Sequence, residues 1–217
     1  MEKKNFLKLY FAIGFVLAFL LWTIFLTVVD VKYIEEWGVS IGFSTVNVAI
    51  KQLIGSHLTL YVITDWLGLV PIFAILVFFV LGIKQLIQRK KIFKVDKDIL
   101  ALGILYFFVF SIYILFEYVV INYRPILING MKEPSYPSST TMLVACIMPT
   151  TIMQIKKRIK NRIFKNVIVI TIIAFIIFMV IGRFLSGVHW FSDIVGGLLF
   201  SASVVFAYSY FFDSYKS

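Results

Sequence analysis

The sequence predicts an all-α polytopic membrane protein, a bundle of six transmembrane helices with an interfacial amphipathic segment between the first two. Hydrophobic residues make up 61% of the 217 residues, against about 45–50% in soluble domains. Charged residues make up only 15%. Several apolar runs also approach the roughly 20 residues that a helix needs to cross a bilayer. Residues 1–217 are therefore expected to form a single integral membrane domain.

Six apolar runs give the expected spans. They cover residues 9–29, 67–87, 99–120, 140–155, 167–185 and 194–212. The first run is too long for the core of a signal peptide, so we interpret it as a transmembrane helix. The fourth run is short, which indicates that it begins in space lined by protein rather than by lipid.

The connection over residues 30–65 is the most irregular part of the sequence. Within it, Ile50, Leu53 and Ile54 fall on one helical face, next to Lys51. This pattern predicts an amphipathic helix that lies in the membrane interface.

Basic residues are divided unevenly between the two ends of the expected bundle. Of the 21 Lys and Arg residues, 16 fall on the side of the termini, with dense clusters at residues 89–97 and 156–165. The other five are Lys32, Lys51, Arg124, Lys132 and Arg183. By the positive-inside rule, both termini are expected in the cytoplasm, and the opposite end faces outward from the cytoplasmic membrane.

Charge and cysteine content exclude several functional classes. The formal net charge is +10, but the basic clusters are expected to contact anionic lipid headgroups. No nucleic-acid partner is expected, because no aromatic platform or binding motif accompanies them. Cys146 is the only cysteine, which excludes a disulfide scaffold. No carboxylates or histidines cluster as metal ligands, so no metal or other cofactor is expected. The oligomeric state stays open.

Polar side chains gather at the outer ends of the expected spans. Residues 117–125 end the third span, residues 136–141 begin the fourth, and residues 182–193 join the fifth to the sixth. Ionisable groups are costly at the edge of a membrane, so this clustering indicates a functional site.

The residue types in these segments fit a phosphate. His189 and Asp193 are four residues apart, so the carboxylate can accept one imidazole proton and leave the other nitrogen free to attack. Arg124 and Arg183 carry permanent charge on forked donors suited to phosphate oxygens. Ser138 opens a helical run, whose first N–H groups form a ready anion site. Together they predict a phosphoryl-transfer site that needs no metal.

Each of these residues also has a purely structural interpretation. Arg124 alone could anchor the chain at the interface, and Ser138 alone could be only a helix cap. His189 and Asp193 could form only a structural hydrogen bond. The functional interpretation depends on all of them falling on the same side of the membrane.

The order of these groups resembles the type-2 phosphatidic acid phosphatase superfamily of integral membrane lipid phosphatases. Its three motifs are Lys, six residues and Arg-Pro; then Pro-Ser-Gly-His; then Ser-Arg, five residues, His, three residues and Asp. The matching residues here are Arg124, Pro125, Pro137, Ser138, Arg183, His189 and Asp193. They lie within residues 117–193, and the third motif is the specific one.

The resemblance implies a role for each matched residue. His189 would be the nucleophile that forms a phosphohistidine, and Asp193 would orient it. Arg124, Arg183 and Ser138 would hold the phosphate.

Three positions depart from the family pattern. Glu117 stands in place of the lysine, Ser139 and Thr140 replace Gly-His, and Gly182 replaces the serine. The missing histidine is the family's general acid, and losing such an acid typically costs about 10²–10⁴ in rate. Without it, a lipid diphosphate is expected to react better than a monophosphate, because a departing phosphate needs no proton.

We therefore expect an enzyme, a metal-independent phosphatase or related phosphotransferase at the outer membrane face. Its partners would be the bilayer and a phosphorylated membrane lipid, with polyprenyl diphosphate favoured. One alternative is a non-catalytic binder or transporter of a phosphorylated lipid that uses the same residues. Another is a structural membrane component with a degenerate site.

Overall fold

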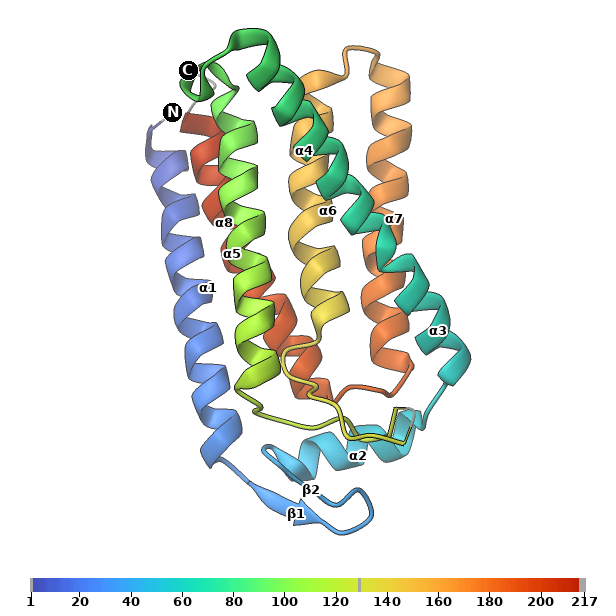
Figure 1. The fold of residues 1–217 in the computed structure, drawn as a ribbon. Helices are drawn as coiled ribbons and strands as arrows, with labels where there is room; N and C mark the ends of the chain where they lie inside the picture. The colour runs from blue at the N-terminus through green and yellow to red at the C-terminus, as the bar shows by residue number, and fades with distance from the viewer. Residues whose placement is uncertain (1, 129, 215–217) are drawn as a thin grey trace.

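The chain forms a bundle of long helices with a hairpin and a short crossing helix at one end (Figure 1). A computed structural model describes residues 2–128 and 130–214. The helices are α1 (Glu2–Val28), α2 (Ser44–Ile54), α3 (Leu58–Leu67), α4 (Leu69–Arg89), α5 (Lys97–Tyr118), α6 (Ser139–Arg158), α7 (Arg162–Leu185) and α8 (Phe191–Ser214), with a 3₁₀ turn, η1, at Ile92–Lys94. In the hairpin, β1 (Lys32–Ile34) pairs antiparallel with β2 (Val39–Ile41).

Five of the six expected spans have the length and apolar composition of membrane-crossing helices. They are Asn5–Val28, Leu58–Arg89, Lys97–Tyr118, Arg162–Leu185 and Phe191–Ser214. Apart from the small hairpin, this confirms the predicted all-α membrane class. The second span begins at Leu58 rather than at residue 67, because α3 runs into α4 at Gly68, whose backbone stays helical (φ −59°, ψ −17°).

The fourth expected span, α6, is less apolar because protein surrounds it. It packs against α4, α5, α7 and α8, and its Thr150 and Gln154 are fully buried. A helix inside a bundle can pair such groups with its neighbours, which lipid could not do. The hydroxyl oxygens of Thr150 and Tyr106, for example, lie 2.9 Å apart.

The apolar core lies between α1, α5, α6 and α8. Phe19, Leu102, Ile147 and Phe200 are buried there, one from each helix. Many apolar side chains on the outside of the bundle stay exposed, as Phe107 does at 74%. Such a surface fits a protein whose outer face contacts hydrocarbon.

The predicted amphipathic helix is present as α2, with its polar face turned toward the protein. Lys51 is only 8% exposed, whereas Leu53 is 86% exposed. Ser44 and Asn47 are buried on the same face as Lys51. The lysine can lie inside because oxygen atoms surround its ammonium group, as described below.

The two termini lie at one end of the bundle, together with η1 and the α6–α7 connection (Figure 1). Nδ2 of Asn5 donates a hydrogen bond of 2.7 Å to Oγ of Ser214, which ties the start of α1 to the end of α8. The two basic clusters therefore share an end with the termini, as the sequence predicts. Lys216, counted with them, lies outside the described residues.

A polar network holds this end together. It consists of Gln85, Asp96, Asp98, Gln154 and Arg158. Asp98 Oδ2 accepts from Nε2 of Gln154 at 2.9 Å and from Nη2 of Arg158 at 3.1 Å. Nε2 of Gln85 donates to Asp96 at 2.9 Å, and Arg158 also reaches Asp96. The network therefore connects α4, α5 and α6.

Replacing the buried carboxylate of this network is expected to destabilise the fold. The Asp98 side chain is 2% exposed. Asp98→Asn removes the buried negative charge that pairs with Arg158 and should lower the free energy of unfolding by about 1–3 kcal/mol. Thermal unfolding in detergent should show a lower midpoint. The control Asp213→Asn breaks a more exposed pair with Lys8 and should stay within about 0.5 kcal/mol of the wild type. Equal midpoints for the two variants would contradict this role of the network.

Candidate functional site

Three segments meet at the end of the bundle that carries α2. They are the α5–α6 connection (residues 119–138), the α7–α8 connection (residues 186–190) and α3. The predicted residues that they bring together are Arg124, Arg183, His189 and Asp193.

The imidazole of His189 is held through Nδ1. This nitrogen lies 3.0 Å from the carbonyl oxygen of Ser135 and 3.8 Å from Oδ2 of Asp193. Because a carbonyl oxygen only accepts, we assign the proton to Nδ1, which donates it to Ser135. The lone pair then lies on Nε2, which is buried and lacks a hydrogen-bond partner among the described residues. The ring is thus arranged as a nucleophile.

The surroundings keep this imidazole neutral. Burial lowers the pKa of His189 well below its ordinary value, and the charges of Arg124 and Arg183 lower it further. The hydrogen bond to Ser135 acts in the opposite direction but is the smaller effect. A lowered pKa means that protonation requires more acid, so the ring stays neutral and nucleophilic at pH 7.

Asp193 holds the backbone around His189 instead of taking the imidazole proton. Its Oδ2 accepts from the main-chain N–H of Trp190 at 2.9 Å, and its Oδ1 accepts from Nδ2 of Asn122 at 3.2 Å. The i, i+4 spacing predicts that the carboxylate itself accepts the ring proton, but the carbonyl of Ser135 takes that place. At 3.8 Å the carboxylate still lies close enough to stabilise positive charge on the ring.

The two arginines converge on one aromatic ring. The guanidinium carbons of Arg183 and Arg124 lie 4.9 Å and 6.0 Å from the centre of the Tyr61 ring, within the range of a cation–π contact. Nη1 of Arg183 is 3.5 Å from Oδ1 of Asp65, and Nε of Arg124 is 3.2 Å from Oε2 of Glu133. The ring and the two carboxylates together hold two like charges near one another.

Five buried polar atoms of the site lack a hydrogen-bond partner among the described residues. They are Nε and Nη1 of Arg124, Nε of Arg183, Oγ of Ser135 and Nε2 of His189. Of these, Nε of Arg124 still lies within ion-pair distance of Glu133. Buried polar groups are normally paired, so these atoms indicate a missing ligand. A phosphoryl group fits them, because its oxygens accept from guanidinium groups and its phosphorus accepts a lone pair. The described residues contain no three His, Cys, Asp or Glu side chains grouped as metal ligands.

Arg124 and His189 open onto one small cavity. Its lining residues are Tyr113, Phe116, Glu117, Arg124, Pro134, Ser135, Tyr136, Pro137, Ser139, Met142 and His189. The volume is about 10 Å³, which is room for about one water molecule. Of the predicted residues that depart from the family pattern, Glu117 and Ser139 are in this lining. A phosphoryl group is larger than a water molecule, so its binding requires lining side chains to move.

Ser138 and Thr140 lie at the start of α6 but outside the lining of this cavity. Ser138 is fully buried, and its Oγ donates to Oγ1 of Thr141 at 3.0 Å. The methyl group of Thr140 packs beside Gly68, where α3 meets α4. The N-terminus of α6 therefore reaches the cavity through Ser139.

The sequence pattern assigned no role to five residues that contact the predicted site residues. They are Tyr61, Asp65, Asn122, Glu133 and Ser135. Tyr61 and Asp65 lie one helical turn apart on α3, within the stretch of residues 30–65 where the sequence predicts an irregular connection. Extending the second span to Leu58 would have placed Asp65 inside an apolar helix, where a charged residue is expected to face the bundle. Ser135 acts through its main-chain carbonyl, for which side-chain patterns give no signal.

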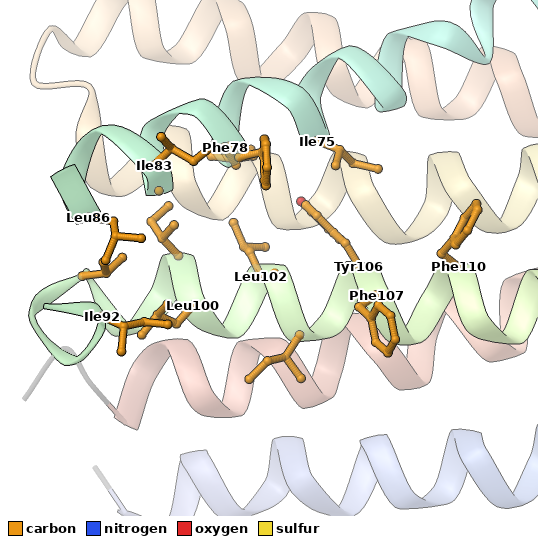
Figure 2. Close-up of a pocket in the computed structure, with 16 residues that line it drawn as sticks. Ile75, Phe78, Ile83, Leu86, Ile92, Leu100, Leu102, Tyr106, Phe107 and Phe110 are labelled. Carbon is orange, nitrogen blue, oxygen red and sulfur yellow. The ribbon is translucent and has the colours of Figure 1, made fainter.

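A larger hollow lies between α4 and α5, but it is not a phosphate site (Figure 2). Its volume is about 580 Å³, and Tyr106 is the only lining residue with a polar side chain. The Tyr106 hydroxyl is already within hydrogen-bond distance of Thr150. A surface of this composition suits hydrocarbon, so the small charged cavity is the candidate site.

Comparison with known proteins gives a family match and a match to a solved structure. The family model described as the PAP2 superfamily matches residues 118–216, the part that carries Arg124, Arg183 and His189. The crystal structure of a transmembrane PAP2-type phosphatidylglycerolphosphate phosphatase from Bacillus subtilis aligns with a TM-score of 0.63 and 17% identity. The alignment covers 94% of this chain and 97% of that one, which shows a shared fold. None of the curated proteins matches the chain. Residues 118–216 therefore match the PAP2 superfamily, and the chain shares its fold with a PAP2-type phosphatase.

Proposed function

We propose that the protein is a membrane lipid phosphatase that uses His189 as its nucleophile. The match of residues 118–216 to the PAP2 superfamily supports a membrane phosphatase in general. The observation that carries the proposal is the unpaired, buried Nε2 of His189, on a ring that feels the charges of Arg124 and Arg183, each of which has an unpaired buried nitrogen. A lone pair beside two fixed cations is suited to attack on a phosphate.

The reaction proceeds in two steps. Nε2 of His189 attacks phosphorus, and a P–N bond forms while the P–O bond to the leaving group breaks with its electron pair on oxygen. Arg124 and Arg183 stabilise the charge on the non-bridging oxygens. Water, or an acceptor hydroxyl in a phosphotransferase, then attacks phosphorus. The P–N bond breaks with its electron pair on Nε2, and the proton of the attacking oxygen passes to solvent. Asp193 offsets the positive charge that the ring carries in the phosphohistidine.

The substrate class follows from the leaving group. A phosphate monoester expels an alkoxide, which needs a proton about as much as hydroxide does. A lipid diphosphate expels a lipid phosphate, whose last pKa is about 6, so it can leave unprotonated. No histidine stands at Thr140 to supply a proton. Polyprenyl diphosphate is therefore the favoured substrate, with other lipid phosphates as slower ones.

The proposed site faces outward from the cytoplasmic membrane. Support comes from the 16 basic residues on the side of the termini and from the position of the termini at the end of the bundle opposite α2 (Figure 1). In a Cys146→Ser background, a cysteine at position 160 should resist a membrane-impermeant thiol reagent applied to intact cells. Labelling at that position from outside would reverse the orientation and place the site in the cytoplasm.

Removing the nucleophile is expected to abolish turnover. His189→Ala should lower kcat by roughly 10³-fold or more on any lipid phosphate that the wild type cleaves. Wild-type protein quenched in alkali during turnover of labelled substrate should carry an acid-labile phosphate, and His189→Ala should not. The exposed His57, changed to Gln, provides the matched control and should keep full activity. If the wild type binds lipid phosphates without cleaving them, and His189→Ala binds equally well, the protein is a binder and not an enzyme.

The proton supply can be tested at Glu117, the acidic residue in the cavity lining. If diphosphates leave without a proton, wild-type kcat/KM should be about 10²-fold higher for polyprenyl diphosphate than for the monophosphate. Glu117→Gln should then preserve this ratio. Glu35→Gln, at an exposed carboxylate of the hairpin, is the matched control. Loss of activity on both substrates in Glu117→Gln alone would instead make Glu117 the general acid.

A further inference from the structure

Helix α2 contains buried polar side chains that the proposed chemistry does not use. Asn47 is 1% exposed and Lys51 is 8% exposed. The two residues are four positions apart and share one face of the helix. That face contacts residues 187–192, the segment that carries His189 at its centre.

Lys51 binds the start of this segment. Its Nζ donates to the carbonyl oxygen of Gly187 at 2.7 Å, to the carbonyl oxygen of Gly55 at 2.9 Å, and to Oγ of Ser56. An ammonium group has three donors, and all three are used. Two of these acceptors, Gly55 and Ser56, directly follow α2, so the lysine joins the end of that helix to the backbone two residues before His189.

The contact at Gly187 is close enough to require glycine. The residue has φ +65°, and a Cβ atom placed on it would lie 2.0 Å from the carbonyl oxygen of Gly55. Beside it, the main-chain N–H of His57 donates to the carbonyl oxygen of Ser186 at 2.9 Å. The chain after α7 is therefore packed tightly against the segment that follows α2.

Asn47 binds the other end of the segment. Its Oδ1 accepts from the main-chain N–H of Ser192 at 3.1 Å, and its Nδ2 donates to Oγ of Ser192 at 2.9 Å and to the carbonyl oxygen of Gly42 at 2.8 Å. The first N–H groups of a helix have no partner inside the helix. Asn47 of α2 thus pairs a main-chain N–H in the first turn of α8, that of Ser192, which directly precedes Asp193.

We propose that α2 is a clamp that positions the nucleophile, with Lys51 and Asn47 as its positioning residues. The proposal depends on the function proposed above, because it assigns His189 the role of nucleophile. Neither residue contacts the cavity, so the clamp acts through the backbone of residues 187–192. Fixing both ends of this segment keeps Nδ1 of His189 against Ser135 and Nε2 toward the cavity. A misplacement of about 1 Å can cost roughly 10² in rate.

The test compares Lys51→Met with Gln52→Met, a matched control at the neighbouring exposed position of α2. Lys51→Met is expected to lower kcat by about 10–100-fold and leave KM nearly unchanged, because Arg124 and Arg183 keep their contacts. Lys51→Arg should recover part of the loss, since it restores a cationic donor. Asn47→Ala, at the other end of the clamp, should reproduce the loss of kcat independently.

Hydrogen exchange separates positioning from general stability. In Lys51→Met, amides of residues 187–192 should exchange faster than in the wild type, while those in the middle of α7 and α8 should not change. A kcat equal to that of Gln52→Met, or faster exchange throughout the bundle, would overturn the proposal. If the wild type cleaves no lipid phosphate, the function proposed above fails. In that case the exchange data alone decide whether α2 holds the segment.

Discussion

The hydrogen bond from Nδ1 of His189 to the carbonyl oxygen of Ser135 is the interaction on which the site depends. It joins two connections of the bundle through residues 54 positions apart in the sequence. Because it fixes the tautomer, it also decides that the free lone pair lies on Nε2. The contacts of Asp193 with Asn122 and Trp190 serve the same arrangement, since they hold both connections in register.

The two arginines of the site are suited to bind an anion, and each is already paired with a carboxylate of the protein. Arg124 already lies 3.2 Å from Glu133, and Arg183 lies 3.5 Å from Asp65. These acidic side chains reduce the cost of keeping two arginines next to a buried imidazole. They leave Nη1 of Arg124 and Nε of Arg183 without hydrogen bonds. A phosphate that entered would complete both, and in doing so it would compete with Glu133 for Arg124.

The sequence predicts the membrane class and five of the spans, and four of its candidate site residues lie close together in the fold, for a physical reason. Apolar runs must be long to cross a bilayer, and ionisable residues are rare enough there to mark a site. The short fourth run predicts that α6 begins in space lined by protein. That four other helices surround α6 could not be predicted, because low apolarity in a short run fits several arrangements. The roles of Ser135 and Lys51 could not be predicted either. Ser135 acts through its backbone, and Lys51 looks like any interfacial lysine until the fold brings Gly187 to it.

Close packing between α8 and the chain before α6 brings the second and third motifs together. The main-chain N–H of Ser138 donates to the carbonyl oxygen of Asp193 at 3.1 Å, a distance that only closely packed segments allow. Gly196 of α8 makes room for the chain before α6, because a Cβ atom at this position would lie 2.4 Å from the ring of Tyr136. Lipid provides no hydrophobic force between helices, so membrane helices associate through such small-residue contacts. The same packing sets the position of Ser135, immediately before Tyr136, and therefore the point at which the imidazole of His189 is held.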